Sequence, residues 1–244
     1  MEVSVANVER VAALAKKLLT IHVGEGKKDT WIWQHSERVR RLASMIAALP
    51  ELATRPIDRD ALAAACLFHD AGWIVQLQSG SIDRWRLLGK PTSDIQRELG
   101  AALMRENISR LIPAASLETA VEAIRQCNFR QSSLVEAEIL GEAENLDDVG
   151  VIQLLKQVRQ HQADGRAIEQ LLSAWKRQQE YQFWEARIKD SFRFESIRQL
   201  ARVRLAAVDR FMSAISSEHE GGDLLKLIEA LGVDLDEIAA VAQS

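Results

Sequence analysis

The 244-residue sequence is poor in several residue types, and each scarcity excludes a class of protein. It has two cysteines, Cys66 and Cys127, which do not form a CxxC pair, so neither a disulfide framework nor a cysteine-based zinc site is expected. Only four prolines and one tyrosine occur, and no stretch alternates β-branched and polar residues as a strand does. Because alanine, leucine, glutamate, arginine and glutamine are abundant instead, the composition predicts an all-α fold.

Long apolar runs and an excess of positive charge are also missing. No apolar run approaches the roughly 18–20 residues that a bilayer crossing requires. Glu2, Glu9 and Arg10 interrupt the first apolar residues, which is not typical of a secretory signal. The formal net charge of −4 argues against dedicated nucleic-acid binding. We therefore expect a cytoplasmic protein with no membrane partner.

Helical periodicity and stop signals divide the chain into a series of predicted helices. Their approximate ranges are 5–21, 30–49, 58–68, 93–108, 116–127, 134–146, 149–160, 166–189, 191–215 and 224–242. Asp58 is expected to cap the third helix, and Ser93 with Gln96 forms a capping-box pattern before the fourth. Residues 73–91 contain several helix breakers and are expected to form a long loop with short helical turns at most.

The chain is long enough for one large domain with a small addition. A Gly-Gly pair at 221–222 precedes the last predicted helix. We expect residues 1–218 to form a single helical domain and residues 219–244 a short C-terminal helical appendage. The amphipathic face of this appendage would permit a homodimer without requiring one.

The third predicted helix carries the strongest sign of a functional site, because Ala61 to Phe68 is followed directly by His69 and Asp70. A helix that is apolar all round is buried, so two ionisable groups at its end need partners. A divalent metal ion is one solution, since imidazole and carboxylate both ligate such ions. The alternative is a His–Asp pair that caps the helix or bonds to a neighbouring turn, and the dipeptide alone favours that alternative.

Two other predicted helices carry residues of the same chemical types. His35 lies early in the second helix with Arg38 one turn later. Glu142 and Glu144 lie toward the end of the helix at 134–146, and Asp147 follows it directly. His35 and His69 are 34 residues apart, which is too far for a zinc-finger site. The spacing suits a site assembled from helices that pack together.

This ordered set of motifs resembles the HD-domain superfamily of metal-dependent phosphohydrolases. The family pattern is a His followed by Arg-Val, a helix that ends in His-Asp, and an Asp-Ala-Asp-Arg-Leu-Asp stretch. Residues 35–39 and 67–72 match the first two parts, and residues 142–150, Glu-Ala-Glu-Asn-Leu-Asp-Asp-Val-Gly, are similar to the third. Residues 181–218 resemble the C-terminal helices of one bacterial subgroup. The resemblance covers most of residues 1–218 and implies an HD-domain-like helical bundle.

The resemblance implies one bound divalent metal ion, which would be Mn, Fe, Co, Ni, Zn or Mg. The ligands that it implies are His35, His69, Asp70 and Glu144. Glu144 stands where the family has an Asp and is one methylene longer, so Asp147 and Asp148 are alternative fourth ligands. Members with two metals have extra histidines near the positions of Arg97 and Cys127, so at most one metal is expected here.

The implied activity is hydrolysis of a small phosphorylated metabolite or nucleotide. Asp70 is the candidate catalytic residue, both as a ligand and as a proton acceptor. Arg38 is the first candidate for phosphate binding because its guanidinium forms paired hydrogen bonds with oxyanions. Lys28 and Arg97 are weaker candidates for the same role.

Two other functions remain open at this stage. The first is a catalytically degenerate HD scaffold that binds a ligand or a protein. Two departures from the family pattern favour it: Glu144 replaces an Asp, and Trp73 stands where several phosphatase members have a Glu. Oxygen-dependent di-iron chemistry ranks last, because the additional histidines are missing. A buried ionisable cluster kept without its metal would be unstable, which favours a hydrolase that retains metal binding.

Overall fold

The structure is a computed structural model that describes residues 2–129 and 131–232. Its helices are α1 (Glu2–Leu18), α2 (Trp31–Ile46), α3 (Arg59–Phe68), α4 (Gly72–Gln78), α5 (Asp94–Ile108), α6 (Ala114–Gln126), α7 (Val135–Asp147), α8 (Val151–Ala163), α9 (Ile168–Glu180), α10 (Phe183–Ser191), α11 (Glu195–Glu220) and α12 (Gly222–Ala230). The described strands are β1 (Ile21–His22) and β2 (Lys28–Asp29), which form one small antiparallel hairpin. The predicted all-α fold is confirmed.

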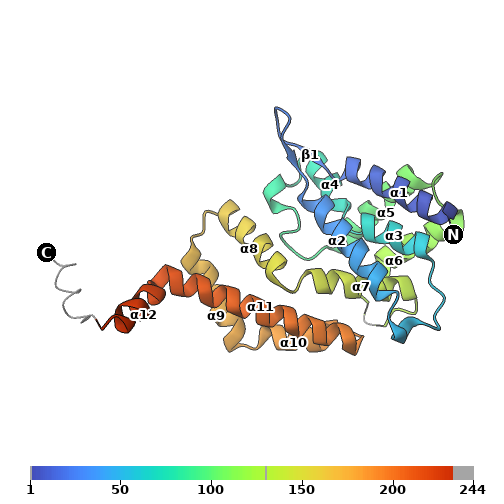
Figure 1. Ribbon diagram of the computed structural model, residues 1–244. Helices are drawn as coiled ribbons and strands as arrows, with labels where there is room; N and C mark the ends of the chain where they lie inside the picture. The colour runs from blue at the N-terminus through green and yellow to red at the C-terminus, as the bar shows by residue number, and fades with distance from the viewer. Residues whose placement is uncertain (1, 130, 233–244) are drawn as a thin grey trace.

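Two regions are distinguished in Figure 1. Helices α1–α7 pack into a bundle that we call the body, and α8–α12 form what we call the C-terminal arm, with α12 projecting away from the body. Within the body α3 is central, because it packs against α1, α2, α5, α6 and α7. The arm approaches the body through α11 against α7 and through α8 against the short 3-10 turn at Arg84–Arg86.

Burial explains why α3 is the central helix. Every one of its residues from Ala61 to Phe68 except Ala63 is buried. The Asp58 side chain caps the helix by accepting a hydrogen bond of 2.9 Å from the Ala61 backbone, as predicted. The Asp58 backbone N–H in turn donates to Glu136 of α7 at 2.7 Å. The start of α3 is thereby fixed to a neighbouring helix, and its other end delivers His69 and Asp70.

The turn after α3 packs directly on the backbone of α5. A Cβ atom built on Gly72 would lie 1.9 Å from the carbonyl oxygen of Gln96, and one on Gly100 would lie 2.7 Å from that of Phe68. Only glycine permits so close an approach at these two positions. The predicted capping box at the start of α5 is present, with Ser93 and Gln96 bonded to each other's backbone N–H groups.

Three local predictions were wrong. Residues 73–91 were expected to contain short helical turns at most, whereas α4 is a regular seven-residue helix at 72–78, where Trp73 and Ile74 are buried. The helix predicted over 166–189 is interrupted at Gln182, whose φ of 50° is left-handed, and this break separates α9 from α10. The first helix was predicted to reach Ile21, but it ends at Leu18 and Ile21 enters the hairpin. In each case tertiary packing decides what local periodicity leaves ambiguous.

The proposed division at residue 218 remains a prediction. Helix α11 continues through that position to Glu220, and α12 follows it after the left-handed Gly221. The helix predicted over 224–242 corresponds to α12 only as far as Ala230, because Leu231 and the left-handed Gly232 form a turn there, and residues 233–242 lie outside the described residues.

Candidate metal centre

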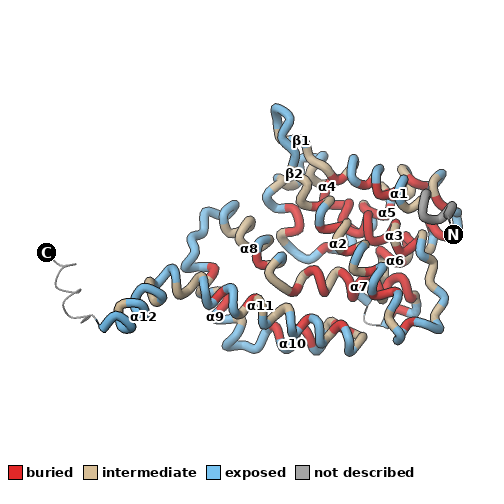
Figure 2. Tube along the Cα trace, in the orientation of Figure 1, coloured by how far each residue is buried: buried red, intermediate tan, exposed pale blue. Residues whose placement is uncertain are grey.

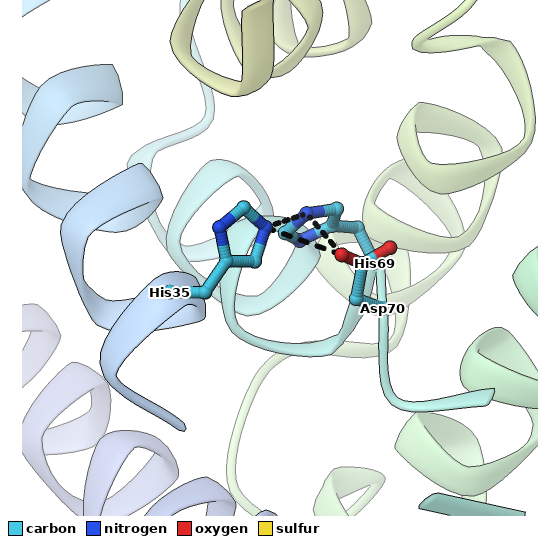
Figure 3. A group of neighbouring side chains, drawn as sticks. All are labelled: His35, His69 and Asp70. Carbon is cyan, nitrogen blue, oxygen red and sulfur yellow. Dashed lines mark hydrogen bonds and ion pairs between the residues drawn. The ribbon is translucent and has the colours of Figure 1, made fainter. Parts of the chain in front are cut away.

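Three buried side chains converge where α2 meets the end of α3 (Figure 3). His35 comes from α2, and His69 and Asp70 follow α3 directly. The His35 Nε2 atom lies 3.2 Å from His69 Nε2 and 3.1 Å from Asp70 Oδ2. His69 Nε2 lies 3.4 Å from the same Asp70 oxygen. Two nitrogens and one oxygen therefore face one point, as ligands of a single ion do.

The outer nitrogens of both imidazoles have hydrogen-bond partners that set the ring orientation. His69 Nδ1 lies 2.8 Å from the Cys66 carbonyl oxygen. Because a carbonyl only accepts, Nδ1 carries the hydrogen and Nε2 presents its lone pair to the cluster. His35 Nδ1 lies 2.8 Å from Asp147 Oδ2, which acts as an acceptor in the same way. Such outer partners are typical of metal-ligating histidines.

This arrangement fits a divalent cation. Two Nε2 lone pairs that face each other at 3.2 Å repel unless a proton or a metal ion lies between them and the carboxylate. Two imidazoles and a carboxylate are suitable ligands for Mn, Fe, Co, Ni or Zn. The cluster of His35, His69 and Asp70 is thus able to hold a metal, whose identity the residues do not determine.

The side chains of His35, Asp70 and Asp147 shift one another's pKa values. Burial disfavours a charge on His35, but its hydrogen bonds to Asp147 and Asp70 outweigh burial and raise its pKa to about 9. Burial also opposes ionisation of Asp70 and Asp147, yet the imidazoles of His69 and His35 hold the pKa of Asp70 well below its usual range, and His35 with Arg38 does the same for Asp147. A proton on His35 therefore occupies this position when no metal ion does.

Two consecutive hydrogen bonds, which sequence analysis did not predict, hold the Asp70 side chain in place. Its Oδ1 accepts a hydrogen bond from the Thr92 hydroxyl, and that hydroxyl oxygen accepts one from Trp73 Nε1 at 3.0 Å. Trp73 stands where several family members have a Glu, so the indole here orients Thr92 and cannot act as a base. Nothing in the sequence near Thr92 indicates this role, because 22 residues separate it from Asp70.

The predicted fourth ligand, Glu144, is not among the three converging groups. Its carboxylate lies 4.0 Å from the Arg97 guanidinium and 3.8 Å from Cys127 Sγ. It nevertheless lines the same cavity as His35 and Asp70. Asp147, one of the two alternatives, contacts His35 on the outer side of the imidazole.

The cavity beside the cluster has a volume of about 250 Å³ and receives residues from both the body and the arm. Its basic lining residues are Lys90, Arg97, Lys156 and Arg187. Asp148, the other alternative ligand, lies 3.2 Å from Lys156 Nζ and 3.1 Å from the Arg187 guanidinium. Sequence patterns provide no reason to select Lys156 or Arg187, since both lie on ordinary polar helix faces.

The three predicted phosphate-binding residues lie in three different places. Arg97 is buried in the cavity wall and donates to the Thr92 carbonyl at 3.2 Å, while its Nε has no partner among the described residues. Arg38 forms paired hydrogen bonds of 2.8 and 3.0 Å with Asp147 and lines a second cavity. Lys28 is exposed on β2.

A helical bundle that brings together a buried His-His-Asp cluster defines a helical protein with a candidate metal site. The HD-domain family model matches residues 32–188, and the chain therefore belongs to the HD-domain superfamily, which includes metal-dependent phosphohydrolases. No curated protein shows significant similarity to the sequence.

Solved structures of one bacterial protein share the fold. The crystal structure of Bacillus subtilis YpgQ in complex with ADP has a TM-score of 0.57 and 17% identity, covering 88% of this chain and 96% of that one. The structure of selenomethionine YpgQ gives a TM-score of 0.55 with 13% identity, covering 88% of this chain and 95% of that one.

None of the helices in the described part of the chain combines the length and hydrophobicity that a membrane crossing requires. The cytoplasmic location and the homodimer remain predictions.

Proposed function

We propose that this protein hydrolyses a phosphate ester or anhydride of a small metabolite, with a nucleotide as the first substrate to test, and that it uses one divalent metal ion. The observation that carries the proposal is the convergence of His35 Nε2, His69 Nε2 and Asp70 Oδ2, three buried atoms from two helix regions that lie within 3.4 Å of one another. Two imidazole nitrogens and one carboxylate oxygen that converge in this way form a suitable ligand set for one divalent ion.

In this proposal His35, His69 and Asp70 hold the ion, and Glu144 supplies the fourth ligand from the cavity wall. When bound, the ion would supply Lewis acidity, which lowers the pKa of water and polarises a phosphoryl oxygen. Asp70 stays ionised at neutral pH because its imidazole neighbours hold its pKa below the usual range, which suits a metal ligand, and its role as proton acceptor is what the family resemblance implies. Asp147 and Thr92 keep His35 and Asp70 in position.

The cavity supports a phosphorylated substrate of modest size. Four basic side chains line its roughly 250 Å³, and guanidinium and ammonium groups bind phosphate oxygens well. Arg97 is the best placed of the residues selected from the sequence, and Lys156 and Arg187 add two cations at the arm side. That YpgQ was crystallised with ADP supports a nucleotide as the first substrate to test.

The test is the metal content of protein purified without chelator, measured by mass spectrometry for the wild type, His69→Ala and Glu144→Ala. His161→Ala is the matched control, since His161 lies on α8 outside the cluster. We expect about one metal per chain in the wild type and in His161→Ala, and a large loss in His69→Ala. ADP and p-nitrophenyl phosphate hydrolysis, assayed with the metal found, then tests turnover.

Loss of metal in Glu144→Ala would identify the fourth ligand, whereas retention would move that role to Asp148 or to water. Absence of metal from the wild type, even after incubation with Mn, Fe, Ni or Zn, would contradict the proposal. The second candidate, an HD scaffold without turnover, would then be preferred. It is favoured by one observation: the Glu144 carboxylate is directed toward Arg97 and Cys127.

A further inference from the structure

A second cavity of about 480 Å³ lies on the other side of Asp147 from the metal centre. Residues of α2, the start of α8 and α11 form it, and three of its lining side chains are arginines: Arg38, Arg41 and Arg204. We call it the arginine groove. Among the described residues that line it, Asp147 alone is acidic. The charge of the groove therefore depends on how much of this arginine charge Asp147 neutralises.

Asp147 is paired with Arg38 rather than with Arg204. Its two carboxylate oxygens accept the paired hydrogen bonds of Arg38, and one of them also contacts His35. Arg204 donates to the Leu146 carbonyl and forms no ion pair within the described part of the chain. Burial lowers the pKa of its guanidinium more than the charge of Asp147 raises it. A partly buried cation without a paired carboxylate is unfavourable unless a ligand supplies the anion.

Arg41 is the second incompletely compensated charge. Its Nε lies 3.8 Å from a Glu37 carboxylate oxygen, which is a long contact at an exposed position. That carboxylate is already held by Arg40 through hydrogen bonds of 2.8 and 2.7 Å. Arg41 therefore keeps most of its hydrogen-bonding capacity for another partner. An anion in the groove would meet both Arg41 and Arg204.

The backbone at the start of α8 adds positive potential to this charge. The cap residue of α8 is Gly150, with a φ of 129°, and within the described chain this helix has neither a side-chain cap nor an acidic residue in its first turn. Its first N–H groups therefore lack the usual anionic partner. Gly150, Val151 and Ile152 all line the groove.

The remaining wall of the groove is apolar. Met45 and Ile152 contribute to it although they are 61% and 45% exposed, respectively. Exposed large apolar side chains beside incompletely compensated arginines are suited to a ligand that has both an anionic head and an apolar part. A plain inorganic anion would leave this apolar wall uncovered.

We propose that the arginine groove is a second ligand site, which binds a small amphiphile through a phosphate or carboxylate head on Arg41 and Arg204 and an apolar part against Met45 and Ile152. The site needs no metal and does not depend on the proposed hydrolase activity. Asp147 forms the wall between it and the metal centre. The ligand would thus bind one side chain away from His35.

The test is isothermal titration calorimetry on the full chain, with octyl phosphate, octanoate and 1-octanol as probes below their aggregation limits. We expect saturable binding of an anionic probe at one site and no comparable binding of octanol. The stronger of the two anions identifies a phosphate or a carboxylate head. Arg204→Gln and, separately, Arg41→Gln should each weaken binding about tenfold, the usual effect of losing a charge-assisted hydrogen bond.

Two control variants distinguish binding in the groove from binding elsewhere on the protein. Arg210→Gln removes an exposed arginine of the same helix as Arg204 and should bind the probe like the wild type. His69→Ala should also leave the affinity unchanged, because His69 lies in the metal centre. Octanol binding as tight as that of the anions would overturn the proposal. So would wild-type affinity in both groove variants, loss of binding in His69→Ala, or no saturation at millimolar probe.

Discussion

The body and the arm differ in how deeply their side chains are buried, as Figure 2 shows by colour. In α3 of the body, every residue from Ala61 to Phe68 except Ala63 is buried, whereas α8 buries only Leu154 and the described part of α12 buries none. The three metal-cluster residues belong to the body, while Lys156 and Arg187 reach the same cavity from the arm.

This difference in burial suits the body to metal binding and the arm to substrate contacts. A metal site requires ligands held to within a fraction of an ångström, and a densely packed core provides that rigidity. Substrate contacts tolerate more adjustment, and less buried elements are suited to them. We therefore expect substitutions in the body to alter folding and metal affinity, and substitutions in the arm to alter substrate binding.

The largest effect should come from a cavity in the body. Leu67→Ala removes a fully buried side chain from α3 and should lower the free energy of unfolding by about 2–5 kcal/mol. Leu225→Ala changes an exposed leucine of α12 and should stay within about 0.5 kcal/mol of the wild type. Urea denaturation measures both. Similar losses in the two variants would contradict the contrast between body and arm.

The junction of the two regions should make stability depend on pH. Burial raises the pKa of Glu142 from 4.5 to about 7, although its carboxylate accepts a hydrogen bond from the backbone N–H of Arg193, which lies between α10 and α11 of the arm. The unfolded chain releases this proton above pH 4.5, and the folded chain keeps it until about pH 7. Stability is therefore lost as the pH rises through this interval.

Between pH 4 and 8 the wild type should lose up to about 3 kcal/mol more than Glu142→Gln, which cannot titrate. Comparing each protein with itself at two pH values removes any constant cost of the substitution. Glu106→Gln, at an exposed position of α5, is the control and should follow the wild type. Parallel pH profiles for the wild type and Glu142→Gln would refute this assignment.

A substitution in the outer partner of His35 should weaken metal binding without removing a ligand. Asp147→Asn replaces the carboxylate that orients the imidazole and should lower metal affinity about 10–100-fold. Competition with a chelating dye measures this in samples shown to be folded. Asp164→Asn at the end of α8 is the control. A change under about twofold in Asp147→Asn would mean that His35 needs no orienting partner.

The smallest effect should come from the arm. Lys156→Ala and Arg187→Ala should raise the KM for p-nitrophenyl phosphate by up to about tenfold, with a smaller change in kcat, because each loses a charged contact to phosphate. Metal content should not change. Lys176→Ala, on the exposed face of α9, provides the matched control. Metal loss in the Lys156 or Arg187 variant would place the arm within the metal-binding scaffold.

Local features of the fold were predictable from the sequence. The Asp58 cap and the Ser93–Gln96 capping box depend on residues three positions apart, and both are present. The burial of α3 followed from its nearly uniform apolar character. By contrast, the break at Gln182 accompanies packing of α9 against α10, where the rings of Trp175 and Trp184 lie 6.2 Å apart. Periodicity within one helix carries no information on such a contact.

For the candidate site, the sequence predicted the three converging residues but not the fourth ligand or the hydrogen-bond partners. The family resemblance selected His35, His69 and Asp70, which the structure brings together. Glu144, Asp147 and Asp148 all lie at the end of α7. Which of them faces the cluster depends on how α7 is rotated about its axis, and a sequence does not give this rotation. The partners of Asp70 and His35 were hidden for a related reason, since Thr92 and Asp147 are 22 and 112 residues away from them.

The contact between Gly72 and α5 has a consequence for moving this site into another protein. Because the turn that carries His69 and Asp70 rests on the Gln96 carbonyl without any side chain between them, its position is set by one backbone against another. Transplanting the ligands alone onto a foreign helix pair would leave this spacing undefined. A transferable unit therefore includes α2, α3, α5 and both glycines, together with α7, which carries the Asp147 partner of His35. Even a single added methyl at residue 72 would separate the ligand-bearing turn from its support.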